Sequence, residues 1–209
     1  ALTCGQKLSK VWDQNKKMTK TYRYYITGNN KGLGLNLSNH FNAEGCSRSS
    51  GLDITKDLDV EHIAKQSLHY DVFINNAFDG PPDEKWGNYG QVKVLMEVFK
   101  LWKFHKKTGW IFNIGSSGTQ GAYTIPKAAL KQASKDCSNA FKYNEVKFKT
   151  TLITPSRLDT PLSRSRSNWT GNGINSLDLA KFIEYTVSMS PNLCIEDLVM
   201  QVNLEYGNE

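Results

Sequence analysis

The feature that most constrains this chain is a regular exchange between short apolar runs and longer stretches with helical apolar spacing. Runs rich in aromatic and β-branched residues lie at 22–27, 71–75, 110–114, 149–153 and 198–202, and a further short strand is expected at 45–47. The stretches predicted to be helical lie at 33–41, 57–69, 88–106, 123–142 and 177–188. This alternation is typical of an α/β fold whose parallel strands are joined by helices. We therefore predict a doubly wound, mostly parallel sheet with helices on both faces.

The charge of the chain is concentrated at its beginning. Residues 1–23 hold six basic side chains and one acid, which accounts for most of the formal net charge of +6. We interpret residues 1–20 as a flexible basic extension and residues 21–209 as a single domain. A nucleic-acid-binding protein carries basic residues across its folded body, so this distribution argues against a nucleic-acid partner. A nucleic-acid binder that acts through the extension is kept as an alternative.

Several other classes of protein are disfavoured by what the sequence lacks. No apolar run approaches the roughly 20 residues that a membrane-spanning helix needs. The first residues contain no apolar stretch of signal-peptide length. The four cysteines are scattered, without the spacing of a zinc site. We expect a cytoplasmic protein with reduced thiols, no metal and no membrane association.

Three glycines stand where the first predicted strand meets the first predicted helix. They belong to the run TGNNKGLG at residues 27–34. Glycine permits close approach of the backbone to a pyrophosphate, and the helix N-terminus then offers free N–H groups and a favourable dipole. The spacing predicts a dinucleotide-binding loop in a Rossmann-type domain.

This glycine spacing resembles the cofactor loop of the short-chain dehydrogenases/reductases. The resemblance implies that the loop contributes cofactor-binding residues, namely Gly28, Asn30, Lys31, Gly32, Leu33 and Gly34. Further family motifs follow in order along residues 21–203. They imply that Asp53 contacts the adenine amino group, and that more of the cofactor site is formed by Asn75, Asn76, Ala77, Pro155 and Thr160. Phe78 replaces the glycine that usually follows Asn-Asn-Ala, and a helix-capping role for Thr160 is the alternative.

The residue that follows the second strand bears on the choice of nicotinamide cofactor. An acid there would bind the ribose 2′-hydroxyl of NAD, whereas an arginine accommodates the 2′-phosphate of NADP. Arg48 occupies this region, and Lys31 can add a second positive charge. We therefore expect NADP(H) in preference to NAD(H), the alternative being that both side chains are ordinary surface cations.

Reduction of a carbonyl group needs a proton donor at its oxygen and a cation that makes the donor more acidic. Tyrosine and lysine four residues apart on a helix can form such a pair, and the spacing occurs three times, at 89/93, 123/127 and 143/147. Only Tyr123 and Lys127 follow a strand ending in Asn-Ile-Gly-Ser, which resembles the family's Asn-Ile-Ser-Ser. The resemblance therefore implies that Tyr123 is the acid/base and that Lys127 binds ribose and tunes it.

The same resemblance implies two further catalytic residues. Ser116 aligns with the serine that orients the substrate oxygen, although its neighbour Ser117 is the alternative. Asn88 fits the asparagine that supports proton relay to the lysine, and an ordinary helix N-cap is its alternative. Only six residues separate Ser116 from Tyr123, which is short for the family and indicates an open pocket.

Together these features predict an NADP(H)-dependent oxidoreductase that transfers hydride between nicotinamide and a small carbonyl or alcohol substrate. The family commonly pairs subunits, so a homodimer or homotetramer is expected. The alternative from another class is a non-catalytic NADP(H)-binding sensor or partner-docking module on the same fold.

Overall fold

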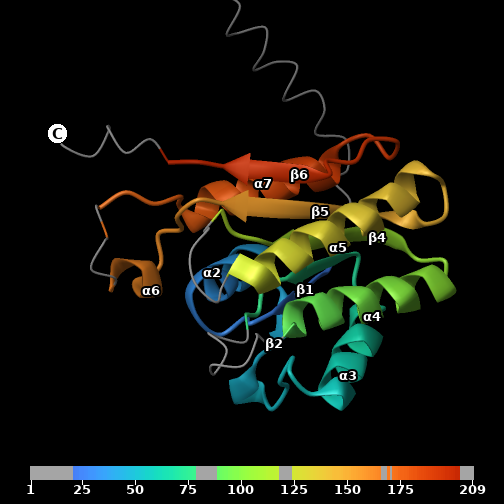
Figure 1. Ribbon diagram of the computed structural model, residues 1–209, viewed down its shortest axis with the longest axis horizontal. Helices are drawn as coiled ribbons and strands as arrows, with labels where there is room; N and C mark the ends of the chain where they lie inside the picture. The colour runs from blue at the N-terminus through green and yellow to red at the C-terminus, as the bar shows by residue number, and fades with distance from the viewer. Residues whose placement is uncertain (1–20, 79–88, 118–123, 166–168, 170, 203–209) are drawn as a thin grey trace, which may run out of the picture.

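The computed structural model describes residues 21–78, 89–117, 124–165, 169 and 171–202 (Figure 1). Its strands are β1 (Tyr24–Thr27), β2 (Glu44–Cys46), β3 (Val72–Asn75), β4 (Thr108–Ile114), β5 (Lys147–Pro155) and β6 (Asp197–Met200). Its α-helices are α2 (Gly32–Phe41), α3 (Asp57–Ser67), α4 (Gly90–Phe104), α5 (Thr124–Lys142), α6 (Pro161–Arg164) and α7 (Ser176–Ser188). A short 3-10 helix, η1 (Arg48–Ser50), follows β2.

The six strands form one parallel sheet in the order β2-β1-β3-β4-β5-β6. The chain first runs outward from β1 to β2 and then returns to the other side of β1, so that β3 pairs with β1. This reversal is the topological switch point of a doubly wound sheet, and ligands of such folds bind beyond the carboxyl ends of the strands beside it. The predicted Rossmann-type fold is therefore confirmed, and it directs attention to the ends of β1 and β3.

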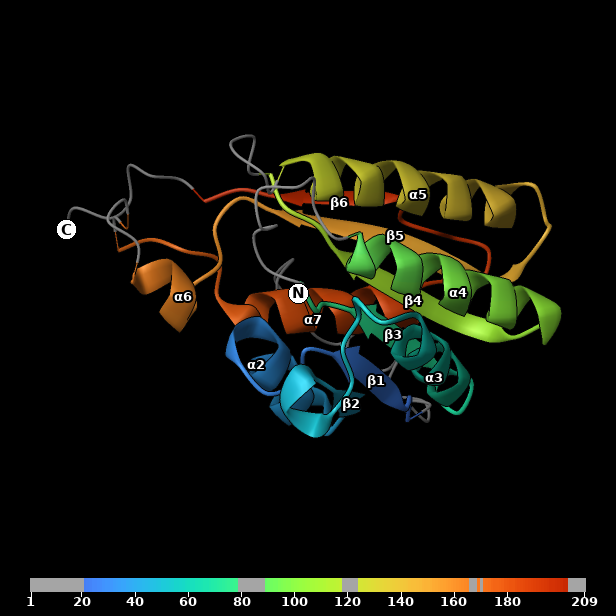
Figure 2. The same cartoon turned by 60° about the horizontal axis from the view of Figure 1, so that its bottom comes forward.

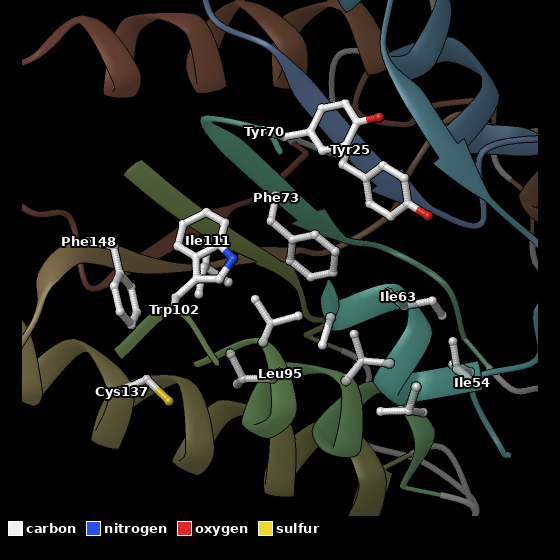
Figure 3. Close-up of a cluster of buried hydrophobic side chains, with 14 of the residues drawn as sticks. Tyr25, Ile54, Ile63, Tyr70, Phe73, Leu95, Trp102, Ile111, Cys137 and Phe148 are labelled. Atoms are coloured by element: carbon white, nitrogen blue, oxygen red, sulfur yellow. The ribbon is translucent and has the colours of Figure 1, made fainter. Parts of the chain in front are cut away.

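Helices cover both faces of the sheet, and Figure 2 shows α4 and α5 on the opposite side from α2 and α7. The face covered by α4 and α5 is packed through a large buried cluster that includes Phe73, Trp102 and Phe148 (Figure 3). The face covered by α2 and α7 is packed through another cluster, which includes Ile26 and Phe112. Among the described helices, none is long and apolar enough to cross a bilayer.

Residues 52–54 follow β2 and η1 in the chain, and they form no strand of the sheet. Only η1 and a turn lie between Cys46 and Leu52. A parallel strand needs a crossover of about a dozen residues to return to the same edge, so this connection is too short to place one. The described sheet consequently ends at β2.

Candidate functional site

A cavity of about 480 Å³ opens at the carboxyl ends of β1, β2 and β3. It is lined by residues from the glycine loop, from the end of β2 and η1, and from the segment after β3. Those discussed below are Gly28, Asn30, Lys31, Ser47, Arg48, Ser49, Asn76, Ala77 and Phe78. The switch point of the sheet and the glycine loop predicted from the sequence therefore meet at one cavity.

The glycine loop is shaped by contacts that exclude a side chain. Gly28 has a φ of +72°, in the left-handed region that favours glycine. A Cβ atom on Gly34 would lie 2.0 Å from the carbonyl oxygen of Gly28 and 2.6 Å from Nδ2 of Asn76. The first turn of α2 thus packs directly on the loop, leaving a backbone surface of the kind that holds a pyrophosphate.

Thr27 connects this loop to the end of β3. Its hydroxyl accepts hydrogen bonds from the backbone N–H groups of Asn76 and Ala77, at 3.0 and 2.9 Å. In return, the side-chain amide of Asn76 donates to the carbonyl of Thr27 at 3.0 Å. The two strand ends on either side of the switch point are therefore held in one fixed arrangement.

A polar corner forms where the loop faces η1. The hydroxyls of Ser47 and Ser49 are hydrogen-bonded at 2.9 Å, and Asn30 donates to Ser49 from the glycine loop. Arg48 lies on the same short helix with its side chain 60% exposed. Lys31, the exposed N-cap residue of α2, adds a second cation to the cavity lining. Hydroxyl, amide and cationic groups together suit a phosphate group.

The structure brings Arg48 and Asp53 together, although the sequence suggested separate roles for them. Nε of Arg48 lies 3.7 Å from Oδ2 of Asp53. The backbone N–H of Thr55 donates to Oδ1 of Asp53 at 3.0 Å, and this bond, with help from Arg48, holds the pKa of Asp53 below its usual value. Asp53 therefore stays ionised and competes for the same guanidinium that a phosphate would bind.

Lys127 lies on the first turn of α5 and is buried at 6% exposure, next to Phe78 of the cavity lining. Its Nζ donates to Oε1 of Gln91 at 2.7 Å and to the carbonyl oxygen of Ile114 at 2.9 Å. Gln91, from the first turn of α4, donates through Nε2 to the same carbonyl and to that of Asn75, at 3.0 and 2.7 Å. One glutamine thus fixes the lysine relative to the ends of β3 and β4.

The network continues through two buried asparagines in the sheet. Nδ2 of Asn75 donates to the carbonyl of Gln91 at 2.8 Å and to Oδ1 of Asn113 at 3.0 Å. Asn113 then donates to the hydroxyl of Ser134 on α5 at 3.1 Å. All four of these side chains are at most 4% exposed, so the network belongs to the core as much as to the site.

Phe78 covers Lys127 from the side of the cavity. Nζ of the lysine lies 5.0 Å from the centre of the phenylalanine ring, within cation–π range. The same ring lines the cavity that contains the glycine loop. Phe78 therefore stands between the buried ammonium and the space that a nucleotide would occupy.

The serine loop and the segment after β5 complete this edge of the sheet. The backbone N–H groups of Gly115 and Ser117 donate to the carbonyls of Ile153 and Pro155, at 2.7 and 3.1 Å. These bonds hold half-buried Ser116 and Ser117 beside the end of β5. The two serines thus lie on the loop directly after Ile114, whose carbonyl accepts from Lys127.

Thr160 caps a helix and also lies near the glycine loop. Its hydroxyl accepts from the backbone N–H of Ser163 at 3.3 Å and so caps α6. Its Cβ also lies 3.9 Å from the position that a Cβ on Gly32 would take. The capping residue is therefore close to the glycine loop as well.

Two predicted catalytic residues, Tyr123 and Asn88, lie outside the described residues. The lysines of the three tyrosine–lysine spacings nevertheless differ clearly. Lys93 is half-exposed and pairs with Asp57 at 2.8 Å, and Lys147 is exposed at the start of β5, whereas Lys127 is buried in the network. Burial thus sets Lys127 apart from the other two.

Sequence reasoning missed Gln91, the α4 side chain that contacts Lys127. The signal that could have found it is its place on the apolar stripe of the helix. Gln91 is buried in line with residues at helical spacing, and these are Val94, Leu95, Val98 and Trp102. A glutamine within such a stripe must satisfy its amide inside the protein, and a polar partner was therefore to be expected.

No protein-family model and no curated protein sequence matches the chain. Solved structures do match. A betaketoacyl-ACP reductase from Bacteroides thetaiotaomicron is 21% identical with a TM-score of 0.68, over 88% of this chain and 98% of that one. A short chain dehydrogenase from Burkholderia cenocepacia in complex with NADP is 16% identical with a TM-score of 0.68, over 89% and 90%. A 3-ketoacyl-(acyl-carrier-protein) reductase from Brucella melitensis complexed with NADH is 18% identical with a TM-score of 0.64, over 86% and 95%.

These likenesses establish the fold. The chain has the architecture of the short-chain dehydrogenase/reductase structures, as the motifs predicted. The matched proteins include one with NADP and one with NADH, so the comparison by itself does not choose between the two cofactors.

Proposed function

We propose that this protein is an oxidoreductase of the short-chain dehydrogenase/reductase family that uses NADP(H). The observation that carries the proposal is the buried Lys127 network, whose ammonium contacts Phe78, a residue that lines the glycine-loop cavity. Burial of a lysine costs free energy, and Lys127 differs from the similarly buried Lys149 because its ammonium contacts a residue of the cavity lining. The carboxyl edge of a doubly wound sheet is also where such folds bind nucleotides.

The residues fit the proposed cofactor in kind and in place. The backbone of Gly28 and the start of α2 would hold the pyrophosphate, while Arg48, Lys31 and the η1 serines would hold the ribose phosphate. The cofactor would supply or accept the hydride at its nicotinamide ring.

The chain's own residues would manage the substrate oxygen and its proton. We assign Tyr123 as the proton donor, because a protonated lysine beside a phenol stabilises the phenolate. Lys127 would be that cation, held in position by Gln91 and the carbonyl of Ile114. Ser116 would orient the substrate oxygen by a hydrogen bond. The substrate class that this arrangement suits is a small carbonyl compound or alcohol.

We also propose that subunits pair through the helices on the α4–α5 face. The support is exposed apolar surface on α4 and at the start of α5, where Met96 is 48% exposed and Ile125 is 46% exposed. Sedimentation of the wild type and of Met96→Lys checks this, since the charged variant should shift the protein toward monomer.

The test of the proposed function is a calorimetric titration of NADPH and NADH into the wild type and Arg48→Ala. The wild type should prefer NADPH, and the variant should lose about 10-fold to 100-fold in NADPH affinity with little change for NADH. The matched control is Arg23→Ala, because Arg23 pairs with Asp71 in a similarly exposed contact of 3.9 Å at the amino ends of β1 and β3, away from the cavity at their carboxyl ends. Nucleotide affinity in that control should not change.

Activity is then measured with a panel of aldehydes and ketones and with Tyr123→Phe as the inactive control. Absence of binding for both nucleotides would overturn the proposal. NADPH binding without turnover of any carbonyl compound would favour the non-catalytic sensor instead.

A further inference from the structure

We infer that one end of the molecule, away from the glycine-loop cavity, binds single-stranded nucleic acid. This surface, the basic end, consists of residues 100–108 and 142–147, where α4 and α5 end and β4 and β5 begin. It is separate from the proposed cofactor site, because that cavity lies at the carboxyl ends of β1, β2 and β3. Binding there would be a second function of the protein.

The two segments of the basic end lie side by side. Thr108 and Lys147 are register partners at the amino ends of β4 and β5. Nζ of Lys103, in the last turn of α4, lies 2.9 Å from Oε2 of Glu145, in the connection after α5. Figures 1 and 2 both place these ends of α4 and α5 at the same end of the molecule. The side chains of both segments therefore belong to one surface.

Positive charge is concentrated at the basic end, although the chain after residue 23 is nearly neutral in sum. The two segments contain one acid, no arginine and six lysines, which are Lys100, Lys103, Lys106, Lys107, Lys142 and Lys147. A lysine in the last turn of a helix offsets the helix dipole, but Lys106, Lys107 and Lys147 lie beyond the last turns of α4 and α5. The summed charge, which argued against a nucleic-acid partner, hides this local field, and such a field attracts a polyanion.

Lys106 stands at a position that glycine usually occupies. Its N–H donates to the carbonyl of Lys103 at 3.1 Å, and the next N–H donates to that of Trp102 at 2.9 Å, which is the Schellman motif of a helix end. Lys106 has a φ of +51°, in the left-handed region where a side chain is unfavourable. The same motif after α5 has Asn144, a common substitute for glycine. A lysine kept in this strained conformation indicates a use for its charge.

Two exposed aromatic rings lie among the lysines. Phe104 is 78% exposed and Tyr143 is 67% exposed. Phe104 directly follows Lys103, and Nζ of Lys142 lies 5.6 Å from the centre of the Tyr143 ring. Unpaired bases stack on exposed aromatic rings while lysines contact the phosphates between them. Rings that alternate with ammonium groups therefore suit a single strand.

The same features disfavour other anionic partners. Interfaces between proteins are depleted in lysine and enriched in arginine, which this surface lacks. A duplex keeps its base faces stacked on one another and would leave the two rings unused. A membrane-binding surface gathers its apolar side chains on one face, whereas Phe104 and Tyr143 lie on separate segments, each next to a lysine.

The test is fluorescence anisotropy of labelled oligothymidylate and oligouridylate with the full chain, over a range of salt concentrations. Affinity should fall with salt, with a slope of log affinity against log salt of about −3, as for about four phosphate contacts. A duplex of the same length should bind about 10-fold more weakly. Phe104→Ala should lower the affinity for a single strand about 10-fold. Leu58→Ala is its control, because it removes a similarly exposed apolar side chain from α3 and should change nothing.

Lys106→Gly separates a binding role from a structural one. Glycine relieves the left-handed backbone, so the midpoint of chemical denaturation should stay the same or rise. Affinity for the single strand should nevertheless fall about threefold, and the salt slope should become shallower by about 0.7. Lys181→Gln, which removes an exposed lysine from α7, is the control and should leave both values unchanged.

Several outcomes would overturn the inference. These are absence of salt-dependent binding, a duplex that binds as tightly as the single strand, and unchanged affinity in both Phe104→Ala and Lys106→Gly. Competition by NADPH would place the oligonucleotide in the cavity instead. Binding that survives Lys106→Gly but is lost when the lysines of the extension are replaced by glutamine would assign it to Lys7, Lys10, Lys16 and Lys17.

Two further comparisons identify the ligand. Capture of the protein by phosphatidylserine vesicles, without oligonucleotide binding, would show a membrane surface and overturn the inference. Tighter binding of oligouridylate than of oligothymidylate, or the reverse, supports it and identifies RNA or DNA as the strand that is bound.

Discussion

The glycine-loop cavity and the Lys127 network are built in opposite ways. At the cavity, the side chain of Arg48 is 60% exposed and its ion pair with Asp53 is open to water. In the network, Gln91 is 4% exposed and Lys127 is 6% exposed, and their partners lie inside the core. An exposed ion pair contributes little to stability, whereas a buried network is costly to break. Substitutions at the Arg48–Asp53 pair can therefore change ligand selectivity without disturbing the fold. Substitutions in the Gln91–Lys127 network should destabilise the fold.

Replacement of Gln91 should cause the largest loss of stability among the variants considered. Gln91→Leu leaves the Lys127 ammonium and the carbonyl of Asn75 without their buried partner, at a cost of about 3 to 4 kcal/mol in unfolding free energy. Chemical denaturation measures the loss. The control is Gln132→Leu, which removes a glutamine from exposed surface of α5 and should cost less than about 0.5 kcal/mol. Similar losses in the two variants would contradict the contrast.

Substitution in the glycine loop tests whether the cavity, despite its exposed ion pair, also has a tightly packed part. Gly34→Ala would place a Cβ 2.0 Å from the carbonyl oxygen of Gly28, so the backbone must move, at a cost of about 2 to 3 kcal/mol. We also expect loss of NADPH binding in calorimetry. Gly51→Ala serves as control, because a Cβ there meets no atom within 4 Å and only its φ of +89° opposes the change. That variant should cost about 1 kcal/mol and bind NADPH normally.

Phe78 lines the cavity and also contacts Lys127 of the buried network. Its removal should change the affinity for NADPH. Its ring covers the Lys127 ammonium, a contact worth about 1 kcal/mol that the ribose of the proposed cofactor would have to displace. Phe78→Ala should therefore bind NADPH about fivefold more tightly in calorimetry, while Phe104→Ala, which removes an exposed ring at the far end of α4, should not. Weaker binding by Phe78→Ala would show that the ring supports the nucleotide rather than excluding it.

The smallest effect on stability is expected at Asp53. Because the folded state holds the pKa of Asp53 below its usual value, the carboxylate stabilises the protein above about pH 4 and loses that contribution as the pH falls through the lowered pKa. Asp53→Asn should cost less than about 1 kcal/mol at pH 7, and the difference from wild type should disappear at acid pH. Denaturation curves at several pH values check this. A stability difference between wild type and variant that grows at acid pH would contradict a lowered pKa of Asp53 in the folded state.

The sequence predicted the centre of the sheet well because β1, β3 and β4 contain short, largely apolar runs, as buried parallel strands require. Eleven predicted segments correspond to strands or helices whose ends differ by a few residues, such as 110–114 against Thr108–Ile114. The two elements that were not anticipated are η1 and α6, of three and four residues. Both are single turns defined by local capping through Ser47 and Thr160, and they have no apolar periodicity to detect.

The roles of the predicted site residues stay predictions, but the structure shows contacts among them that the sequence did not indicate. The motifs identified Arg48, Asp53 and Lys127, yet nothing in their spacing indicated that Asp53 would face Arg48 or that Gln91 would hold Lys127. The Gln91–Lys127 contact joins residues 36 positions apart in sequence and depends on how α4 and α5 pack against the sheet. Arg48 and Asp53 are near in sequence, but they meet only because of the turn that follows η1. Short motifs report local geometry, whereas these pairings follow from the tertiary arrangement.

The early end of the sheet at β2 has a consequence for the protein at high concentration. An outermost strand presents unpaired N–H and C=O groups to which another chain can add, and long flat edges promote aggregation. Here the outermost strands β2 and β6 have only three and four residues, so each offers a short template for intermolecular pairing. The abbreviated connection after β2 thus shortens the chain and leaves an edge that resists association with other sheets.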